Sequence, residues 1–297
     1  MCIDPIESHT VLDCENSVRL SDYACGIFES LPSRKSVKKA IKRGELLVNG
    51  RSSETGHWVK RGEVLSVIAQ AATLPVYRRK LNCVFQDQYF AVVVKPADLP
   101  VSGFQVRNLQ NALAQNLEPS SEVDELRPPR PVHRLDRLTG GLIVIAKTLS
   151  SAAHLGRQFE RREVEKSYVA IVSGPLKEEL HLSQPIDDRE AFTAVSPVGR
   201  LKHQKHGELT LVMAYPKTGR RNQIRVHLSN AGLPVLGDKK FGGIHAGRGL
   251  FLFSQAITFK HPKSEIRLHF ELELPGKFKR YFPEGDKIIA ASHNHTD

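Results

Sequence analysis

One short segment of this 297-residue chain combines residue types that could carry out chemistry on a sugar or a base. In HRLDRLTGG, residues 133–141, the carboxylate of Asp136 stands between Arg134 and Arg137 and is followed by two glycines. Two nearby guanidinium groups favour the ionised form of a carboxylate and can fix its direction by hydrogen bonding. An anionic carboxylate can act as a nucleophile or stabilise a positively charged sugar. A structural Arg–Asp ion pair would leave the same pattern, so the residues alone leave both interpretations open.

The residues on either side of this segment predict that the backbone around Asp136 is rigid. Pro128, Pro129 and Pro131 restrict the backbone that leads into it. The apolar run GLIVIA that follows predicts a buried strand. We therefore expect Asp136 in a firmly held loop at the end of a strand.

HRLDRLTGG is similar to the HRLD-x-x-TSG motif of the RluA-type pseudouridine synthases, a family that isomerises uridine in RNA. Three further stretches resemble motifs of that family in the same order. They are FQDQYFAVVVKPADLPV with Lys95-Pro96, KSYVAIVSG with Tyr168, and TGRRNQIRVHLSNAGLPVLGDKKFGG. The matching stretches reach from residue 85 to residue 243, so the resemblance does not depend on one motif.

The resemblance implies that Asp136 is the catalytic carboxylate, and it assigns roles to three more residues. Arg134 would occupy the space left in the RNA by a flipped nucleotide. Tyr168 would stack on the target base and is a candidate for proton transfer, and Arg225 would pair with Asp136. Flipping is expected because the glycosidic bond of a uridine is hidden within stacked RNA. Isomerisation needs no redox partner, so no metal or organic cofactor is implied.

The chain departs from the family pattern at three places. Gly140 stands where the first motif usually has serine, and Arg221-Asn222 stand where the closing motif usually has Thr-His. The histidine typical of the family after Lys95-Pro96 is missing. None of these departures replaces an assigned catalytic residue. Arg221 adds positive charge near the expected cleft, so we predict that it contacts RNA and bears on which RNA is recognised.

Upstream of these motifs, the sequence predicts a small helix–helix–hairpin module. Apolar residues at helical spacing predict a helix over residues 20–31, and RKSVKKAIKR, capped by Ser33, predicts a second helix. Asn49-Gly50 predicts a tight turn between two strands. In this order, residues 17–69 resemble the alpha-L RNA-binding domain of a ribosomal protein and several RNA-modifying enzymes.

The second helix of this module is basic on an unbroken face. Like charges one helical turn apart repel each other, so an external polyanion is needed to offset the repulsion. The net charge of +11, from 43 Lys+Arg against 32 Asp+Glu, also favours a polyanionic partner. A merely solvated helix surface is the alternative. We predict RNA contact by Arg34, Lys35, Lys38, Lys39, Lys42 and Arg43.

The remaining chain predicts a catalytic domain. Residues 1–16 are expected to form a loose leader and residues 70–80 a linker. Over residues 81–285, strand-like runs such as KSYVAIVSG and QIRVHL alternate with loops and one clear helix, SAAHLGRQFERRE. This pattern predicts an α+β fold whose large, mainly antiparallel (mixed) β-sheet is flanked by helices. Residues 286–297 are expected to form a flexible tail.

The composition argues against several classes of protein. Four widely spaced cysteines fit neither a zinc site nor a disulfide framework. No apolar run is long enough to span a membrane, and MCIDPIES lacks the features of a signal peptide. We therefore expect a soluble, cytoplasmic enzyme that needs no second subunit. Its partner would be ribosomal RNA, foremost of the large subunit, or transfer RNA.

Two other functions fit parts of the sequence. A non-catalytic RNA-binding or ribosome-assembly protein could use the same scaffold, and its RNA binding would survive replacement of Asp136. A glycoside- or phosphodiester-cleaving enzyme would need a second positioned carboxylate or a metal cluster. Asp187-Asp188 could supply such a carboxylate, but they follow Pro185 in an expected turn. The four assigned family residues favour the pseudouridine synthase.

Overall fold

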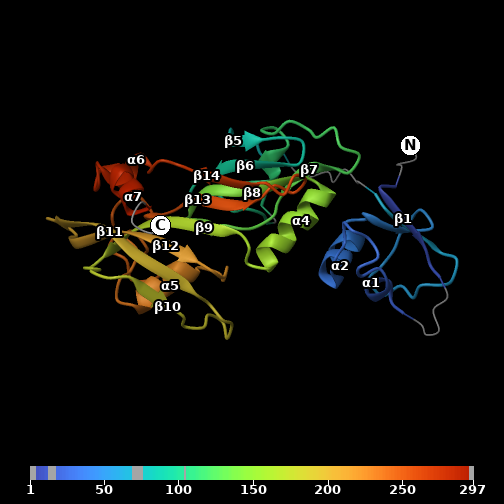
Figure 1. Ribbon diagram of the computed structural model, residues 1–297, viewed down its shortest axis with the longest axis horizontal. Helices are drawn as coiled ribbons and strands as arrows, with labels where there is room; N and C mark the ends of the chain where they lie inside the picture. The colour runs from blue at the N-terminus through green and yellow to red at the C-terminus, as the bar shows by residue number, and fades with distance from the viewer. Residues whose placement is uncertain (1–4, 13–17, 69–75, 104, 294–297) are drawn as a thin grey trace.

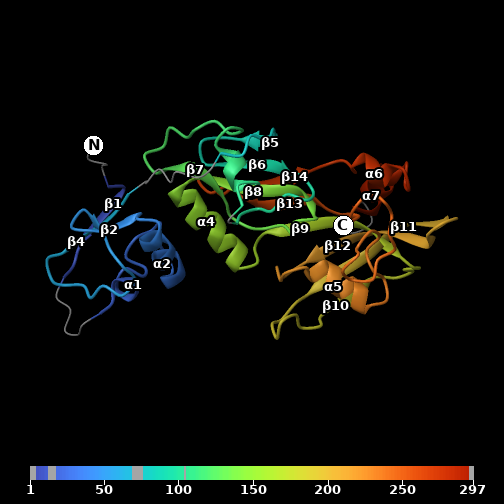
Figure 2. The same ribbon diagram turned by 180° about the vertical axis from the view of Figure 1, so that it is seen from behind.

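The computed structural model describes residues 5–12, 18–68, 76–103 and 105–293. A small sheet and two helices form one end of the molecule, and a large sheet runs through the rest (Figure 1). The opposite view shows the same arrangement, with helix α4 (Leu149–Glu160) beside the small N-terminal part (Figure 2). No helix among these residues is long and apolar enough to cross a lipid bilayer.

The N-terminal part contains helices α1 (Leu20–Tyr23) and α2 (Arg34–Lys42) packed on a four-stranded sheet. Its strands follow the order β1-β4-β2-β3, and each neighbouring pair is antiparallel. The strands are β1 (Glu7–Thr10), β2 (Leu46–Val48), β3 (Arg51–Ser52) and β4 (Val64–Val67).

Two local predictions for this part, a helix cap and a tight turn, are confirmed. Ser33 caps α2 by accepting a hydrogen bond from the backbone N–H of Ser36, and the three apolar residues of α2 are buried. Asn49 and Gly50 both have positive φ, as the tight turn between β2 and β3 requires.

Two expectations for this part are wrong. The helix expected over residues 20–31 ends at Tyr23, and Gly26, with φ of 80°, directs the chain away from a helical path. The expected loose leader contains β1, which pairs with β4 and completes the small sheet.

The large sheet contains ten strands among the described residues, and it is mixed as expected. Its main path runs β10-β11-β12-β9-β13-β8-β6-β5, while β14 pairs with β13 and β7 pairs with β8. Within the described sheet, only β13 and β8 run parallel. The strands are β5 (Asn82–Gln86), β6 (Phe90–Lys95), β7 (Glu125–Pro131), β8 (Gly140–Thr148), β9 (Glu165–Ser173), β10 (Leu180–Leu182), β11 (Thr193–His203), β12 (Gly207–Pro216), β13 (Leu252–Lys260) and β14 (Arg267–Glu271).

The central strands β6 and β8 are apolar at almost every position because both faces of the sheet are covered. On one face, Phe90 and Val92 belong to the same buried cluster as Leu155 of α4. The alternate residues Ala91 and Val93 belong to the cluster on the other face. This burial fixes the end of β8, where the loop of Asp136 is attached.

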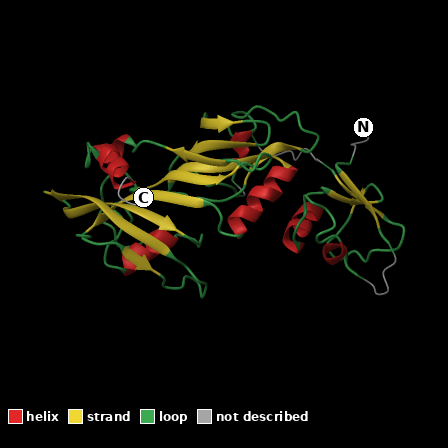
Figure 3. Cartoon of the chain, in the orientation of Figure 1, coloured by secondary structure: helices red, strands yellow, loops and turns green. Residues whose placement is uncertain are grey.

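Helices flank the large sheet (Figure 3), and two of them correct the expectations. QIRVHL is not a strand but part of a helix, because the buried Ile224 and Leu228 lie one helical turn apart. The expected flexible tail is a helix as far as His293, with Ile289 buried. The flanking helices besides α4 are α3 (Gln110–Leu113), α5 (Gln223–Asn230), α6 (Gly276–Lys279) and α7 (Gly285–His293).

The N-terminal part and the large sheet are joined by a shared interior. One buried apolar cluster contains residues of the small sheet together with Leu126, Ala146 and Leu149. Beside it, Glu45, which follows α2 and is 3% exposed, forms an ion pair with both terminal nitrogens of Arg130 on β7. Replacing Glu45 would leave the guanidinium of Arg130 without this partner. Replacing Arg130 would leave Glu45 with the more distant Arg43, at 3.8 Å.

Candidate active site

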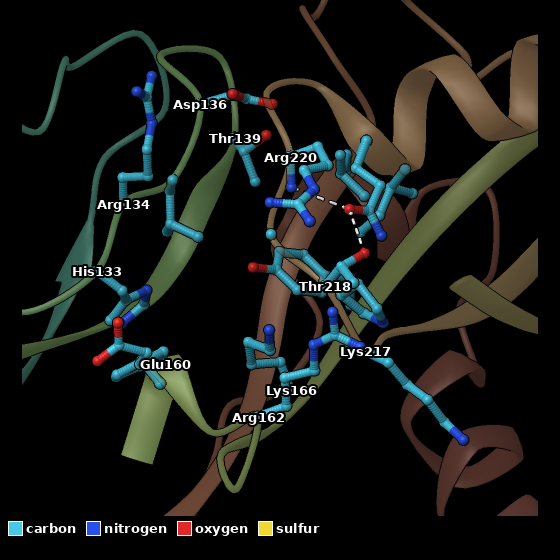
Figure 4. Close-up of a pocket in the computed structure, with 18 residues that line it drawn as sticks. His133, Arg134, Asp136, Thr139, Glu160, Arg162, Lys166, Lys217, Thr218 and Arg220 are labelled. Carbon is cyan, nitrogen blue, oxygen red and sulfur yellow. Dashed lines mark hydrogen bonds between the residues drawn. The ribbon is translucent and has the colours of Figure 1, made fainter. Parts of the chain in front are cut away.

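A cavity of about 470 Å³ lies between the loop before β8 and the loop before α5, within the usual size of a small-molecule site. Its lining comes mainly from residues 133–139, 159–168 and 216–224. Figure 4 shows Asp136 and Thr139 on one side and Thr218 and Arg220 on the other. The sheet topology therefore brings together segments that lie far apart in the sequence.

Asp136 and Tyr168, which were selected from separate motifs, both line this cavity. Burial, together with the smaller effect of the charge of Asp136, raises the pKa of Tyr168 to about 12, while a hydrogen bond with Ser254 acts in the opposite direction. The phenol therefore stays protonated at neutral pH. It can donate a hydrogen bond or present its ring to a ligand, but a phenolate base is excluded near neutrality.

We expect the ionisation of Tyr168 to depend on Asp136. In the wild-type protein this tyrosine should not titrate until about pH 12. Asp136→Asn removes the negative charge that disfavours the phenolate, so the pKa of Tyr168 should fall. Ultraviolet difference titration of both proteins, with Tyr168→Phe to identify the signal, measures the change. An unchanged titration in Asp136→Asn would contradict the proximity of the two groups.

Two glycines allow the loop that carries Asp136 to pack closely against neighbouring backbone. A Cβ atom on Gly141, whose φ is 117°, would lie 2.2 Å from the carbonyl oxygen of Ser254 on the adjacent parallel strand. A Cβ atom on Gly140 would lie 3.2 Å from the carbonyl oxygen of Lys95. Gly141 is therefore required for this strand pairing, whereas Gly140 relieves a tight contact.

The side chain of Lys95 links the loop of Asp136 to the segment that follows β6. It is fully buried, and its ammonium donates to the carbonyl oxygens of Leu99 at 2.8 Å, Pro96 at 2.9 Å and Arg137 at 3.2 Å. Burial lowers the pKa of Lys95 to about 8, although the charge of Asp136 acts in the opposite direction. The Lys-Pro segment thus holds the loop of Asp136 in place.

The arginines beside Asp136 in sequence do not pair with it among the described residues. Arg134 is exposed and lines the cavity, and Figure 4 shows its side chain extending away from Asp136. Arg137 instead lies 3.4 Å from Asp98, and both side chains are more than half exposed. The simple reading of Asp136 as one half of a local ion pair is therefore wrong.

The predicted pair between Arg225 and Asp136 is also wrong. Arg225 donates through Nε and Nη2 to both carboxylate oxygens of Asp238, at 2.7 and 2.8 Å, and through Nη1 to Oδ1 of Asn222. Arg225 is 4% exposed and Asp238 is fully buried. Because residue 225 lies on a helix, its side chain faces the Asp238 turn while the neighbouring Ile224 lines the cavity. Arg225 holds α5 in place beside the cavity.

Four basic residues of the cavity lining were missed from the sequence: Arg162, Lys166, Lys217 and Arg220. Lys166 precedes Tyr168 by two residues on β9, so strand periodicity could have placed it on the same face. Burial lowers the pKa of Lys166, and no carboxylate of the described chain lies within ion-pair distance of it. Arg221, which the sequence favoured, is exposed and is not part of the cavity lining, whereas Arg220 is.

The two histidines near the site make hydrogen bonds within the protein. The Nε2 atom of His133 accepts a hydrogen bond from the N–H of Val144, and its ring stacks on Phe159. Burial lowers the pKa of His133 to about 3, so the ring is neutral. His227 is fully buried and hydrogen-bonded through both ring nitrogens, to Thr193 and to a backbone carbonyl.

The site has no features of a metal centre. The described residues contain no group of three or more His, Cys, Asp or Glu side chains that could bind a metal ion. Asp187 and Asp188 are exposed in a turn with positive φ and do not line the cavity. The second carboxylate of the lining, Glu160, lies beside His133 and away from Asp136 in Figure 4.

The basic face of α2 is exposed, as expected, and lines a shallow depression of its own. Burial and the charges of Lys35 and Arg43 lower the pKa of Lys39, which indicates that these cations repel one another. Arg34 and Arg43 are exceptions, because Asp22, from α1, lies 2.6 Å from Nε of Arg34 and Glu45 lies 3.8 Å from Nη1 of Arg43. The rest of this face has an excess of positive charge.

Comparison with known proteins connects this site to one group of enzymes. Residues 89–230 match a family model described as RNA pseudouridylate synthase. The chain is 32% identical over 279 residues to an uncharacterized RNA pseudouridine synthase of Aquifex aeolicus, with 84% of this chain and 88% of that protein covered. It is 32% identical over 309 residues to ribosomal large subunit pseudouridine synthase D of Vibrio cholerae, with 90% and 91% covered. Its fold resembles that of human RNA pseudouridylate synthase domain containing 1, with a TM-score of 0.54, 23% identity, and 66% of this chain and 84% of that one covered.

Proposed function

This chain belongs to the RNA pseudouridine synthase family, and from that premise we propose that Asp136 is the carboxylate with which it isomerises uridine in structured RNA. One observation carries the assignment. The loop of Asp136, held by Gly141 and Lys95, places this carboxylate in the same cavity as Tyr168 and a set of basic side chains. The cavity therefore combines a reactive carboxylate, an aromatic ring and cations suited to phosphate.

The reaction is balanced without any other reactant. The C1′–N1 bond of the uridine breaks, the detached uracil turns, and a C1′–C5 bond forms. A proton leaves C5 and N1 ends with a proton, so the product is an isomer of the substrate. Asp136 can stabilise positive charge at C1′ or form a covalent bond with the substrate. Tyr168, as a neutral phenol, would offer its ring to the flipped base.

Arg134 fits the role of holding the RNA open. Its exposed position at the edge of the cavity lets a guanidinium enter the space that a flipped nucleotide leaves. A planar guanidinium can stack on the neighbouring bases, which offsets part of the cost of unstacking. Arg221, which is exposed and follows the cavity residue Arg220, would contact RNA outside the cavity.

The proposed substrate is ribosomal RNA, with the large subunit favoured over transfer RNA. The Vibrio cholerae relative, whose name specifies the large ribosomal subunit, is matched over 91% of its length. Residues 17–69 would serve as an RNA-binding module of alpha-L type, and residues 81–285 as the catalytic domain. The exposed cations of α2 are a suitable surface for a phosphate backbone.

Pseudouridine mapping in cells tests the function and the role of Asp136 together. Total RNA is compared from cells that lack the gene and from cells complemented with wild type or Asp136→Ala. We expect one or a few pseudouridines to disappear on deletion and to return with the wild-type gene alone. Restoration by Asp136→Ala would refute the catalytic role of the carboxylate. An unchanged map would favour a protein that binds RNA without modifying it.

Lys166 is proposed to contact a phosphate of the target nucleotide. Lys166→Met should lower kcat/KM about tenfold to a hundredfold, because a hydrogen bond to a charged group is worth about 1.5–3 kcal/mol. Steady-state kinetics on an RNA containing the mapped site measures the effect. Lys166→Arg should recover most of the loss. Lys217→Met is the matched control: Lys217 is also part of the cavity lining, but its side chain extends away from the cavity in Figure 4, so its removal should matter less.

A further inference from the structure

A groove of about 680 Å³ separates the N-terminal part from the catalytic domain. Helix α2 forms one wall and α4 the other, and the two helices lie side by side in both views of the molecule (Figures 1 and 2). The groove has a fixed width because the ion pair of Glu45 with Arg130 and the shared apolar cluster join the two walls. It is therefore a feature of the folded protein.

The groove is rich in positive charge. Lys35, Lys39 and Arg43 line it from the side of α2, and Arg157 lines it from α4. Arg130, from β7, also lines the groove, and burial together with the charge of Arg130 lowers the pKa of Arg43, although Glu45, 3.8 Å from Arg43, acts in the opposite direction. A polyanion in the groove would relieve this repulsion.

The groove leads into the proposed active site. Phe159 and Glu160, at the end of α4, line both the groove and the cavity of Asp136. From Ala152 to Glu160 the helix rises roughly 12 Å, which corresponds to about three or four nucleotide steps. A polyanion that follows α4 from the cavity would therefore reach the cations of α2. This continuity favours nucleic acid over an acidic protein as the occupant.

Gly156 gives the wall of α4 an open surface. Glycine is disfavoured inside helices, and a Cβ atom at this position would meet nothing within 4 Å, so the packing of the protein does not explain it. A glycine allows another backbone to approach closely.

We propose that the groove between α2 and α4 binds the sugar–phosphate backbone of the RNA whose uridine occupies the catalytic cavity, a few nucleotides away from that uridine. The proposal rests on the proposed function, and it extends the RNA contact from the exposed face of α2 to a defined path across α4. The RNA would thus be held at two fixed points on one rigid surface.

Substitutions at Gly156 test this path. Gly156→Glu and Gly156→Gln add side chains of the same size, but only the first opposes a phosphate. We expect Gly156→Glu to raise Kd and KM for a transcript of large-subunit ribosomal RNA at least about tenfold, with the rate at saturating RNA little changed. Gly156→Gln should have a smaller effect. Ser264→Glu adds the same charge at an exposed residue that lines neither the groove nor the cavity, and it should leave Kd unchanged.

The possible results distinguish a failure of the groove proposal from a failure of the proposed function. Equal Kd values for Gly156→Glu and Gly156→Gln would overturn the groove, even if both variants make pseudouridine. A wild-type protein that makes no pseudouridine would contradict the function, while the ratio of the two Kd values still tests the groove. Gly156→Ala should unfold at a higher temperature than wild type, and a lower temperature would show that the fold itself needs this glycine.

Discussion

Asp136→Asn is expected to lower kcat/KM for pseudouridine formation at least about 10³-fold, a loss of about 4 kcal/mol of transition-state stabilisation. The amide cannot act as an anionic nucleophile and cannot balance positive charge at C1′. Release of tritium from RNA labelled at C5 of uridine measures the reaction, because the C5–H bond is broken in every turnover. The change preserves the size of the side chain, so the loop held by Gly141 and Lys95 should keep its structure.

RNA affinity distinguishes lost chemistry from lost binding in this variant. We expect the Kd of Asp136→Asn for RNA to stay within a few-fold of the wild-type value, because phosphate contacts dominate affinity. The melting temperature should also be close to that of wild type. A variant that is folded, binds RNA and retains more than a tenth of the wild-type kcat/KM would show that another group supplies the chemistry.

Arg225→Met is expected to lower the free energy of unfolding by about 3–5 kcal/mol, because it leaves the fully buried carboxylate of Asp238 without its partner. Denaturant unfolding measures this loss. If Arg225 acted on Asp136 during catalysis, the folded variant would lose as much kcat as Asp136→Asn. We expect a smaller loss of kcat, because the main contact of Arg225 is with Asp238.

The double variant Arg225→Met/Asp238→Asn completes the thermodynamic cycle. Removing both charges should cost less than the sum of the two single changes, with a coupling energy of at least about 1 kcal/mol. Arg225→Lys should be intermediate, since one ammonium cannot reproduce the two parallel hydrogen bonds. Additive effects of the single substitutions would contradict the buried pair.

The sequence predicted those local structures that depend on only a few neighbouring residues. Ser33 caps its helix, Asn49-Gly50 form their turn, and the doubly buried strands β6 and β8 are recognisable as apolar runs. The class of the sheet followed from these runs. The motifs also predicted Asp136 and Tyr168 as members of one site, and both line the same cavity.

Charge pairing could not be predicted in this way, because partners are set by the direction in which a side chain leaves its element. Arg225 alternates with apolar residues and fits a strand, but on a helix it faces Asp238. Arg137 is next to Asp136 in sequence, yet it pairs with Asp98. The pair of Glu45 with Arg130 joins residues from two parts of the chain, and no local pattern indicates it. Tertiary contacts decide each of these cases.

The joint between the N-terminal part and the large sheet, formed by Glu45, Arg130 and a common apolar cluster, has a consequence for substrate choice. Two modules on a flexible tether can adapt their spacing to many ligands, but each binding event then loses conformational entropy. Here that entropy is lost once, when the protein folds. If both parts bind RNA as proposed, the adjustment on binding falls on the RNA, and we expect the enzyme to select molecules whose own folding already presents the matching spacing. We then expect it to discriminate between maturation states of one RNA as well as between different sequences.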